Sequence, residues 1–230
     1  MTILAVDTSG PVCGVAVAKD GQILYEAAAV NKRTHSASLM PMIAEALARC
    51  GLTVEDVDVF AAVTGPGSFT GVRIGVSTVK GMAHGAEKPC AGVNALQALA
   101  AGITQSELLI CPIQDARAGQ VYGAAFEAGM PPKRALEDRA AKLEEYLDAV
   151  LQCANEGQKL CFVGDGVTTY REAIQKALGT RAVFPPAHLS MLRPSSAALL
   201  AGFETPVDYL TLMPRYLRAP QAERARKAKL

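Results

Sequence analysis

Two points of the chain place polar residues and glycines directly after apolar runs, where chemistry is often positioned. Asp7-Thr8-Ser9 follows the run ILAV, and the segment GPGSFTGVRIG, residues 65–75, follows the run VFAAVT. A carboxylate at the end of a strand can hold a hydrated magnesium ion, and a glycine-rich loop before a helix can bind phosphate through its backbone N–H groups. One interpretation is therefore a nucleotide or anion site with contacts from Asp7, Thr8, Ser9, Gly65, Gly67 and Ser68.

A purely structural role for both segments stays open. Asp, Thr and Ser side chains often bond the backbone of the turn that they occupy, and glycines suit a tight turn from strand to helix. The segment also lacks the Gly-Lys-Ser/Thr sequence that ends a P-loop. Neutralisation of phosphate charge would then depend on Arg73 or Lys80, and both point away from the loop as the helix advances.

The second half of the glycine segment predicts close contact between helices. On a helix over about 70–85, residues four apart share a face. Val72, Val76 and Val79 form an apolar stripe toward the sheet. A neighbouring stripe consists of Gly71, Gly75, Thr78 and Met82. Glycine costs up to about 1 kcal/mol inside a helix, and close approach of another helix would offset that cost. We interpret the two glycines as a groove for another helix.

Catalytic patterns are incomplete elsewhere in the chain. His35 begins a predicted helix over 34–50, and two metal-ligating histidines on one helix face need a spacing of four residues. Position 39 is Leu, so the pair is broken. No Gly-x-Ser-x-Gly nucleophile elbow occurs. The six cysteines contain no Cys-x-x-Cys pair, and we expect free thiols. We expect no catalytic residue, no metal and no required cofactor, with weak nucleotide binding as the open alternative.

The bulk composition excludes several classes of protein. Of the 230 residues half are hydrophobic and a fifth are charged, which is typical of a globular protein. The formal net charge of +1 argues against a large nucleic-acid surface. No apolar stretch reaches the length of a membrane span, and the N-terminus MTILAVDTSG lacks the basic region of a signal peptide. We therefore expect a cytoplasmic protein.

The elements that must position these residues form a pattern that occurs twice. Residues 1–100 predict three strands, a helix, a strand, a helix, and then a short strand and a helix. From about residue 105 a similar series begins, with Asp115 at the place of Asp7. We predict an α/β fold of two ribonuclease-H-like lobes, each with a mixed sheet flanked by helices, and a cleft between them where α/β ligand sites tend to lie.

The expected boundaries are 1–104 for the first lobe, 105–213 for the second, and 214–230 for a basic tail. The tail either lies in solvent or packs back on the first lobe. In the second lobe, the segment GMPPKRALEDR, residues 129–139, is predicted to be a surface loop. The segment that follows, residues 140–154, is predicted to be a helix.

The chain resembles the TsaB (YeaZ) family of bacterial proteins over nearly its whole length. The segments ILAVDTS, HSASLMPMI, GPGSFTGVRIG, QDARAGQVY, VGDG and PRYLRAP occur in the order typical of that family. The resemblance implies the duplicated fold of the actin/Hsp70/sugar-kinase superfamily. It also implies a non-catalytic subunit that supports the related protein TsaD. TsaD transfers a threonylcarbamoyl group to N6 of the adenosine next to the tRNA anticodon.

The resemblance also implies partners and a docking face. The partners are TsaD in a heterodimer, the ATPase TsaE in a ternary complex, and a second copy of the chain when TsaD is absent, while tRNA is contacted indirectly. The docking face would comprise His35, Leu39, Met42, Ile43, Gly71, Ile74, Gly75, Thr78 and Met82. TsaD carries a His-x-x-x-His metal pair that this chain lacks at position 39. Members of the family often carry an acidic residue after His-Ser, where this chain has Ala37.

Two alternative functions follow from the same fold. A small-molecule kinase or ATPase would use Asp7 for magnesium and residues 65–68 for phosphate. A metallopeptidase of the glycoprotease type would require a metal site, for which the sequence offers no complete ligand set.

Overall fold

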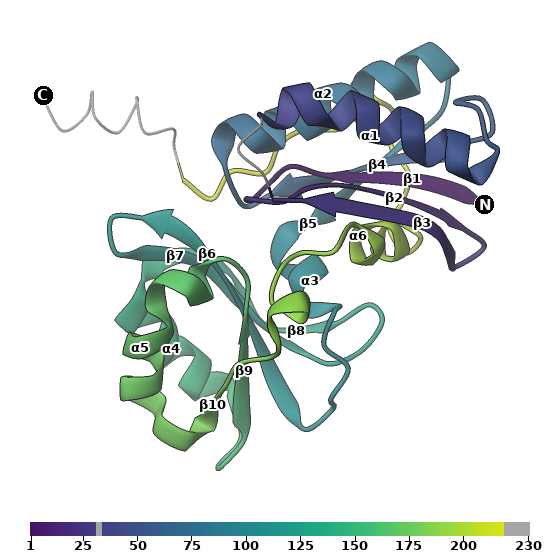
Figure 1. Cartoon of the computed structure of the whole chain (residues 1–230). Coiled ribbons are helices and arrows are strands. Elements are labelled where there is room, and N and C mark those ends of the chain that lie inside the picture. The colour runs from purple at the N-terminus through teal and green to yellow at the C-terminus, as the bar shows by residue number, and fades with distance from the viewer. Residues whose placement is uncertain (31–33, 219–230) are drawn as a thin grey trace, which may run out of the picture.

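The computed structural model describes residues 1–30 and 34–218 as two lobes, each built on a five-stranded mixed sheet (Figure 1). The strands of the first sheet are β1 (Thr2–Asp7), β2 (Cys13–Lys19), β3 (Gln22–Ala29), β4 (Val59–Gly65) and β5 (Cys90–Asn94). Their order is β3-β2-β1-β4-β5. β1 pairs with β2 antiparallel and with β4 parallel.

The second sheet repeats this topology. Its strands are β6 (Leu108–Arg117), β7 (Gln120–Glu127), β8 (Lys133–Lys142), β9 (Lys159–Val163) and β10 (Ala182–Val183). Their order is β10-β9-β6-β7-β8, which read in reverse places all five strands as in the first sheet. β6 pairs with β7 antiparallel and with β9 parallel, as β1 does with its neighbours. The predicted duplicated fold is confirmed.

Helices cover both faces of the first sheet and the outer face of the second (Figure 1). α1 (His35–Cys50) and α2 (Phe69–Ala86) lie on the outer face of the first sheet, close to their predicted bounds. α3 (Ala95–Ala100) and α6 (Pro194–Ala201) lie between the lobes, and α4 (Leu143–Cys153) and α5 (Gly166–Leu178) pack on the second sheet. Short 3₁₀ turns cover Gly179–Arg181 and Ala187–Leu189. No helix in the described ranges is long and apolar enough to cross a membrane.

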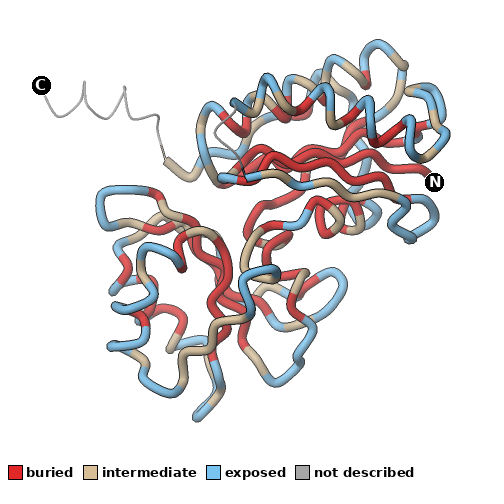
Figure 2. Tube along the Cα trace, in the orientation of Figure 1, coloured by how far each residue is buried: buried red, intermediate tan, exposed pale blue. Residues whose placement is uncertain are grey.

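The strands of the first sheet are largely buried (Figure 2), and their alternating side chains belong to different layers of the core. All six residues of β1 are buried. Leu4 and Val6 belong to a cluster with α1 and α2, whereas Ile3 and Ala5 face α3 and α6. The latter cluster also includes Ile110 and other residues of the second sheet. This inner cluster is therefore shared by the two lobes, while each lobe also has an outer cluster of its own.

One predicted loop is a strand. Residues 133–142 form β8, at the edge of the second sheet, where they pair antiparallel with β7. The prediction of a surface loop over residues 129–139 holds for residues 129–132 and was wrong for residues 133–139. The predicted helix over 140–154 begins only at Leu143 because residues 140–142 still belong to the strand.

The chain returns to the first lobe after the second sheet is complete. Helix α6 packs against β1 and β2 although it falls inside the expected second lobe. Val207 then pairs with Cys90 at the edge of the first sheet, and Leu212 is buried in the cluster below α2. The expected lobe boundaries stay a prediction, but the first lobe includes elements from both ends of the chain.

Candidate functional site

Asp7 lies at the carboxyl end of β1 and turns back on its own loop. Its side chain is only 1% exposed. The Oδ1 atom accepts hydrogen bonds from the backbone N–H and the hydroxyl of Ser9, at 2.8 and 2.7 Å. Burial raises the pKa of Asp7 to about 6, although the bonds from Ser9 and the proximity of His35 act to lower it. The Oδ2 atom has no hydrogen-bond partner.

The loop after β1 packs directly onto the glycines of the second segment. A Cβ on Gly67 would overlap the carbonyl oxygen of Ser9, and a Cβ on Gly71 would overlap that of Thr8. A Cβ on Gly75 would lie 2.7 Å from Thr8 Oγ1. The interpretation of Gly71 and Gly75 as a groove for a helix of another protein was therefore wrong. These glycines are required because the lobe's own first turn occupies the space.

The same packing uses donors that a phosphate would need. The amide of Ser68 donates to Ser9 O at 2.7 Å, and Thr8 Oγ1 donates to Gly71 O at 2.6 Å. Pro66 carries no N–H, and Asp7 is buried under the turn. The Ser68 amide and the Thr8 hydroxyl are thus occupied within the lobe, and Asp7 lies out of reach of a magnesium ion in the cleft, so the geometry does not favour the kinase or ATPase alternative.

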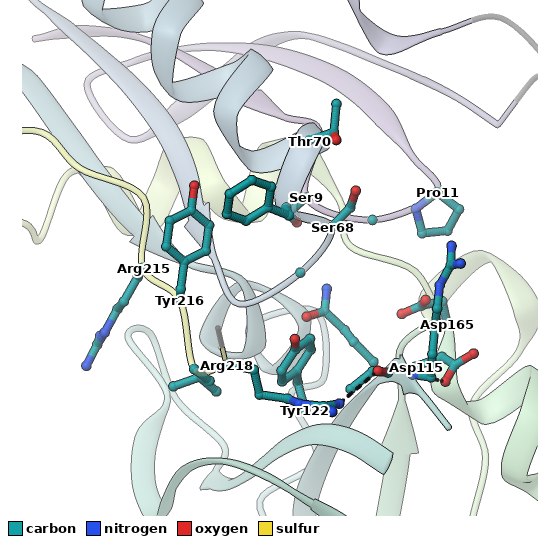
Figure 3. Close-up of a pocket in the computed structure, with 17 residues that line it drawn as sticks. Ser9, Pro11, Ser68, Thr70, Asp115, Tyr122, Asp165, Arg215, Tyr216 and Arg218 are labelled. Carbon is teal, nitrogen blue, oxygen red and sulfur yellow. Dashed lines mark hydrogen bonds between the residues drawn. The ribbon is translucent and has the colours of Figure 1, made fainter. Parts of the chain in front are cut away.

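A cleft of about 540 Å³ separates the lobes above this turn (Figure 3). Ser9, Ser68 and Thr70 line the side of the first lobe. Asp115, Tyr122 and Asp165 line the facing side of the second lobe. Burial raises the pKa of Asp165 to about 6 and the Asp115 carboxylate adds to the rise, against hydrogen bonds from nearby backbone N–H groups.

The end of the described chain closes one side of the cleft. We call residues 212–218 the strap. Its Tyr216 ring lies 4.8 Å from the Phe69 ring on α2, and Arg73 Nε donates to Tyr216 Oη at 2.9 Å. In the second lobe, Arg218 Nη1 donates to Ala116 O at 3.0 Å. The strap thus connects the lobes, whereas residues 219–230 of the expected tail lie outside the described residues.

The predicted docking residues divide into buried and surface positions. Leu39 and Ile43 are each 1% exposed and belong to the core under α1 and α2. They cannot contact a partner unless the lobe opens, so placing them on the docking face was wrong. The surface positions, all half-buried, are His35, Met42, Ile74, Thr78 and Met82. His35 Nε2 lies 3.0 Å from the carbonyl oxygen of Gly10, which ties α1 to the turn after β1.

Sequence reasoning missed a second pair of glycines on α2. Gly81 and Gly85 are exposed, and a Cβ on either would meet no atom within 4 Å. Helix α1 also exposes small residues, namely Pro41, Ala44 and Ala48, beside the charged pair Glu45 and Arg49. The spacing of four residues between Gly81 and Gly85 in KGMAHG indicated a second pair of glycines on one helix face. Gly71 and Gly75 have the same spacing, so spacing alone could not tell the exposed pair from the buried pair.

Comparison with known proteins assigns the chain to a family. A family model described as "TsaD: tRNA N6-adenosine threonylcarbamoyltransferase" matches residues 22–225. The "tRNA threonylcarbamoyladenosine biosynthesis protein TsaB" of Bacillus subtilis (strain 168) is 32% identical over 225 residues, which cover 97% of this chain and 96% of that protein. This chain belongs to the TsaB family. The TsaB protein of Escherichia coli (strain K12) is 37% identical over a shorter region, 55% of each chain.

A solved structure of the TsaB family extends the match to three dimensions. "YeaZ from Pseudomonas aeruginosa" is 27% identical and superimposes with a TM-score of 0.75 over 94% of this chain and 99% of that one. The resemblance to TsaB and YeaZ that the motifs predicted is therefore confirmed. Across residues 1–30 and 34–218, no group of three His, Cys, Asp or Glu side chains is arranged to hold a metal ion.

Proposed function

We propose that this chain is a non-catalytic subunit in the biosynthesis of threonylcarbamoyladenosine in tRNA, and that it binds and supports a TsaD protein. The full-length match to a TsaB biosynthesis protein is the observation that carries the proposal. Position 39 adds support. The metal pair of TsaD needs a second histidine four residues after the first, and at that position this chain has Leu39, which is buried in the core. The chain would thus supply a surface rather than a catalytic group.

The outer surface of α1 and α2 is the docking face that we propose. Both helices pack on the sheet through one side and expose the other (Figures 1 and 2). The exposed side carries small residues, Ala44 and Ala48 on α1 and Gly81 and Gly85 on α2. Small side chains let a partner helix approach closely, which increases dispersion contacts. Met40, 51% exposed on α1, adds an apolar anchor.

The same face would serve the other partners. A second copy of the chain would occupy it when TsaD is absent, and TsaE would join the heterodimer rather than this chain alone. A tRNA would be contacted through the complex. Light scattering of the purified chain, alone and after addition of TsaD, tests whether a second copy and TsaD use the same face. The homodimer should disappear as the heterodimer forms.

The decisive experiment measures binding of a TsaD protein by calorimetry. Gly81→Leu should raise the Kd by about tenfold or more, because the new side chain stands where the partner must approach. It should leave the fold intact, since the position is open and leucine favours a helix over glycine. Ala173→Leu, on the exposed side of α5 in the other lobe, is the control and should bind normally. An unchanged Kd for Gly81→Leu places docking elsewhere, and absence of any wild-type complex rejects the proposal.

A further inference from the structure

A small chamber adjoins the inter-lobe cleft and shares lining residues with it. Its volume is about 10 Å³, close to the size of one water molecule or one ammonium group. Ser9, Gly10, Gln114 and Asp165 line both the chamber and the cleft, so the two spaces adjoin each other. A ligand could therefore place one small group in the chamber and the rest of its body in the cleft.

Two residues that line the chamber each carry a buried oxygen atom without a hydrogen-bond partner among the described residues. They are Oδ2 of Asp7 and Oε1 of Gln114, on side chains that are 1% and 5% exposed. Asp7 comes from the first lobe and Gln114 from the second. A buried acceptor without a donor costs free energy. Because both orphaned atoms are acceptors, the group that satisfies them must donate at least two hydrogen bonds.

The carboxyl groups that line the chamber favour a hydrogen-bond donor that also carries a positive charge. Asp7 and Asp165 both line it, and neither forms a salt bridge with any described residue. Buried carboxylates normally have a positive partner. A water molecule would supply hydrogen bonds without charge. A divalent metal would need more ligands than the described part of the chain arranges in one place.

We propose that the chamber binds a primary ammonium group of a small molecule whose body lies in the cleft. An ammonium group has three donors and a positive charge, and it satisfies Asp7 Oδ2 and Gln114 Oε1 together. Arg117 and Arg218 line the cleft above, and their guanidinium groups suit a carboxylate at the other end of the ligand. The ligand class is a zwitterionic amino acid or a close analogue.

Calorimetry on the full chain with three probes tests this assignment. Glycine carries both the ammonium and the carboxylate, ethylamine carries only the amine, and acetate carries only the carboxylate. Glycine should bind most tightly, ethylamine more weakly and acetate not at all. Saturating glycine should also raise the Tm, since it binds only the folded chain. Equal binding of glycine and acetate, or no saturable binding of either amine, overturns the proposal.

Three variants separate the chamber from the rest of the surface. Asp7→Asn and Gln114→Leu should each weaken glycine binding by about 30-fold or more, because they leave the buried ammonium group without its partner. Asp148→Asn, on the exposed side of α4, should bind like the wild type. If a variant fails to fold, the order of the three probes on the wild-type chain still decides. Unchanged affinity in a folded Asp7→Asn variant would contradict the assignment.

Discussion

Thr8 Oγ1 donates a hydrogen bond of 2.6 Å to the carbonyl oxygen of Gly71, and the carbonyl oxygen of Thr8 stands where any other residue at 71 would place its Cβ. The turn after β1 and the first turn of α2 are therefore in backbone contact. Thr8 and Gly71, 63 positions apart in the sequence, approach each other so closely that position 71 has no room for a side chain.

The first prediction compares two glycines on the same helix. Gly71→Ala should lower the free energy of unfolding by about 1–3 kcal/mol or more, because the methyl group overlaps backbone that has no room to move. Gly81→Ala should raise it by up to about 1 kcal/mol through helix propensity. Urea denaturation measures both. Equal effects at the two positions would show that Thr8 does not pack on Gly71.

The second prediction concerns the charge on Asp7. Its pKa is about 6 in the folded chain, against 3.8 for an ordinary aspartate. Between these values the folded state holds the proton more tightly, so stability falls as the pH rises from about 4 to about 6 and stays reduced above that. Asp7→Asn removes this charge. The variant should be more stable than the wild type by about 3 kcal/mol at neutral pH.

The pH dependence distinguishes charge from packing at this position. The advantage of Asp7→Asn should shrink toward zero as the pH falls below about 4, where the wild-type carboxyl is protonated in both states. Urea denaturation at a series of pH values checks this. A constant difference at every pH would mean that the substitution acts through packing alone.

The third prediction concerns the attachment of α6 to β3. Glu26 accepts hydrogen bonds from the Ser195 N–H and hydroxyl and pairs with Arg193. Burial alone would raise the pKa of Glu26, but these bonds together lower it below the ordinary value. Glu26→Gln should destabilise the chain by about 1 kcal/mol at neutral pH, and should increase hydrogen exchange in α6.

The sign of this effect is opposite to that for Asp7. The stability supplied by ionised Glu26 is fully present above the ordinary pKa of glutamate and is lost as the pH falls through its lower folded value. The difference between the wild type and Glu26→Gln should therefore vanish in acid. Glu45→Gln, in the exposed pair with Arg49 on α1, is the control and should change stability little. A similar loss in both variants would contradict the special role of Glu26.

The fourth prediction concerns the strap. Tyr216→Ala removes the stack on Phe69 and the hydrogen bond from Arg73, so the strap should detach more often and trypsin should cleave faster after Arg215 and Arg218. Tyr216→Phe keeps the ring and should cleave at an intermediate rate. Wild-type rates in Tyr216→Ala would show that other contacts hold the strap.

Local signals in the sequence were sufficient for much of the fold. Helix α1 ends where Gly51 adopts a left-handed conformation with a φ of 65°, as expected of a C-terminal glycine. β8 is different, because its sequence KRALEDRAAK is charged and lacks β-branched residues. It is a strand because β7 supplies its hydrogen bonds. Pairing between strands was not visible from residue types alone.

The candidate site shows a similar limit. The spacing of Gly71 and Gly75 correctly indicated a close approach, but the sequence could not say which segment approaches. The answer depended on Thr8, which chain topology brings to α2. Likewise, Leu39 and Met42 are both apolar, and only the rotation of α1 on the sheet buries the first and leaves the second half-exposed.

The position of α6 and Leu212 has a consequence for the order of folding during synthesis. Domains usually fold from the N-terminus as the chain leaves the ribosome. Here the first sheet is translated early, and α3 follows it directly on the inner face over β4 and β5, yet α6, which packs on β1, β2 and β3, begins only at Pro194, and Leu212 completes the outer core. The inner face over β1, β2 and β3 therefore stays without its helix until nearly the entire chain has emerged.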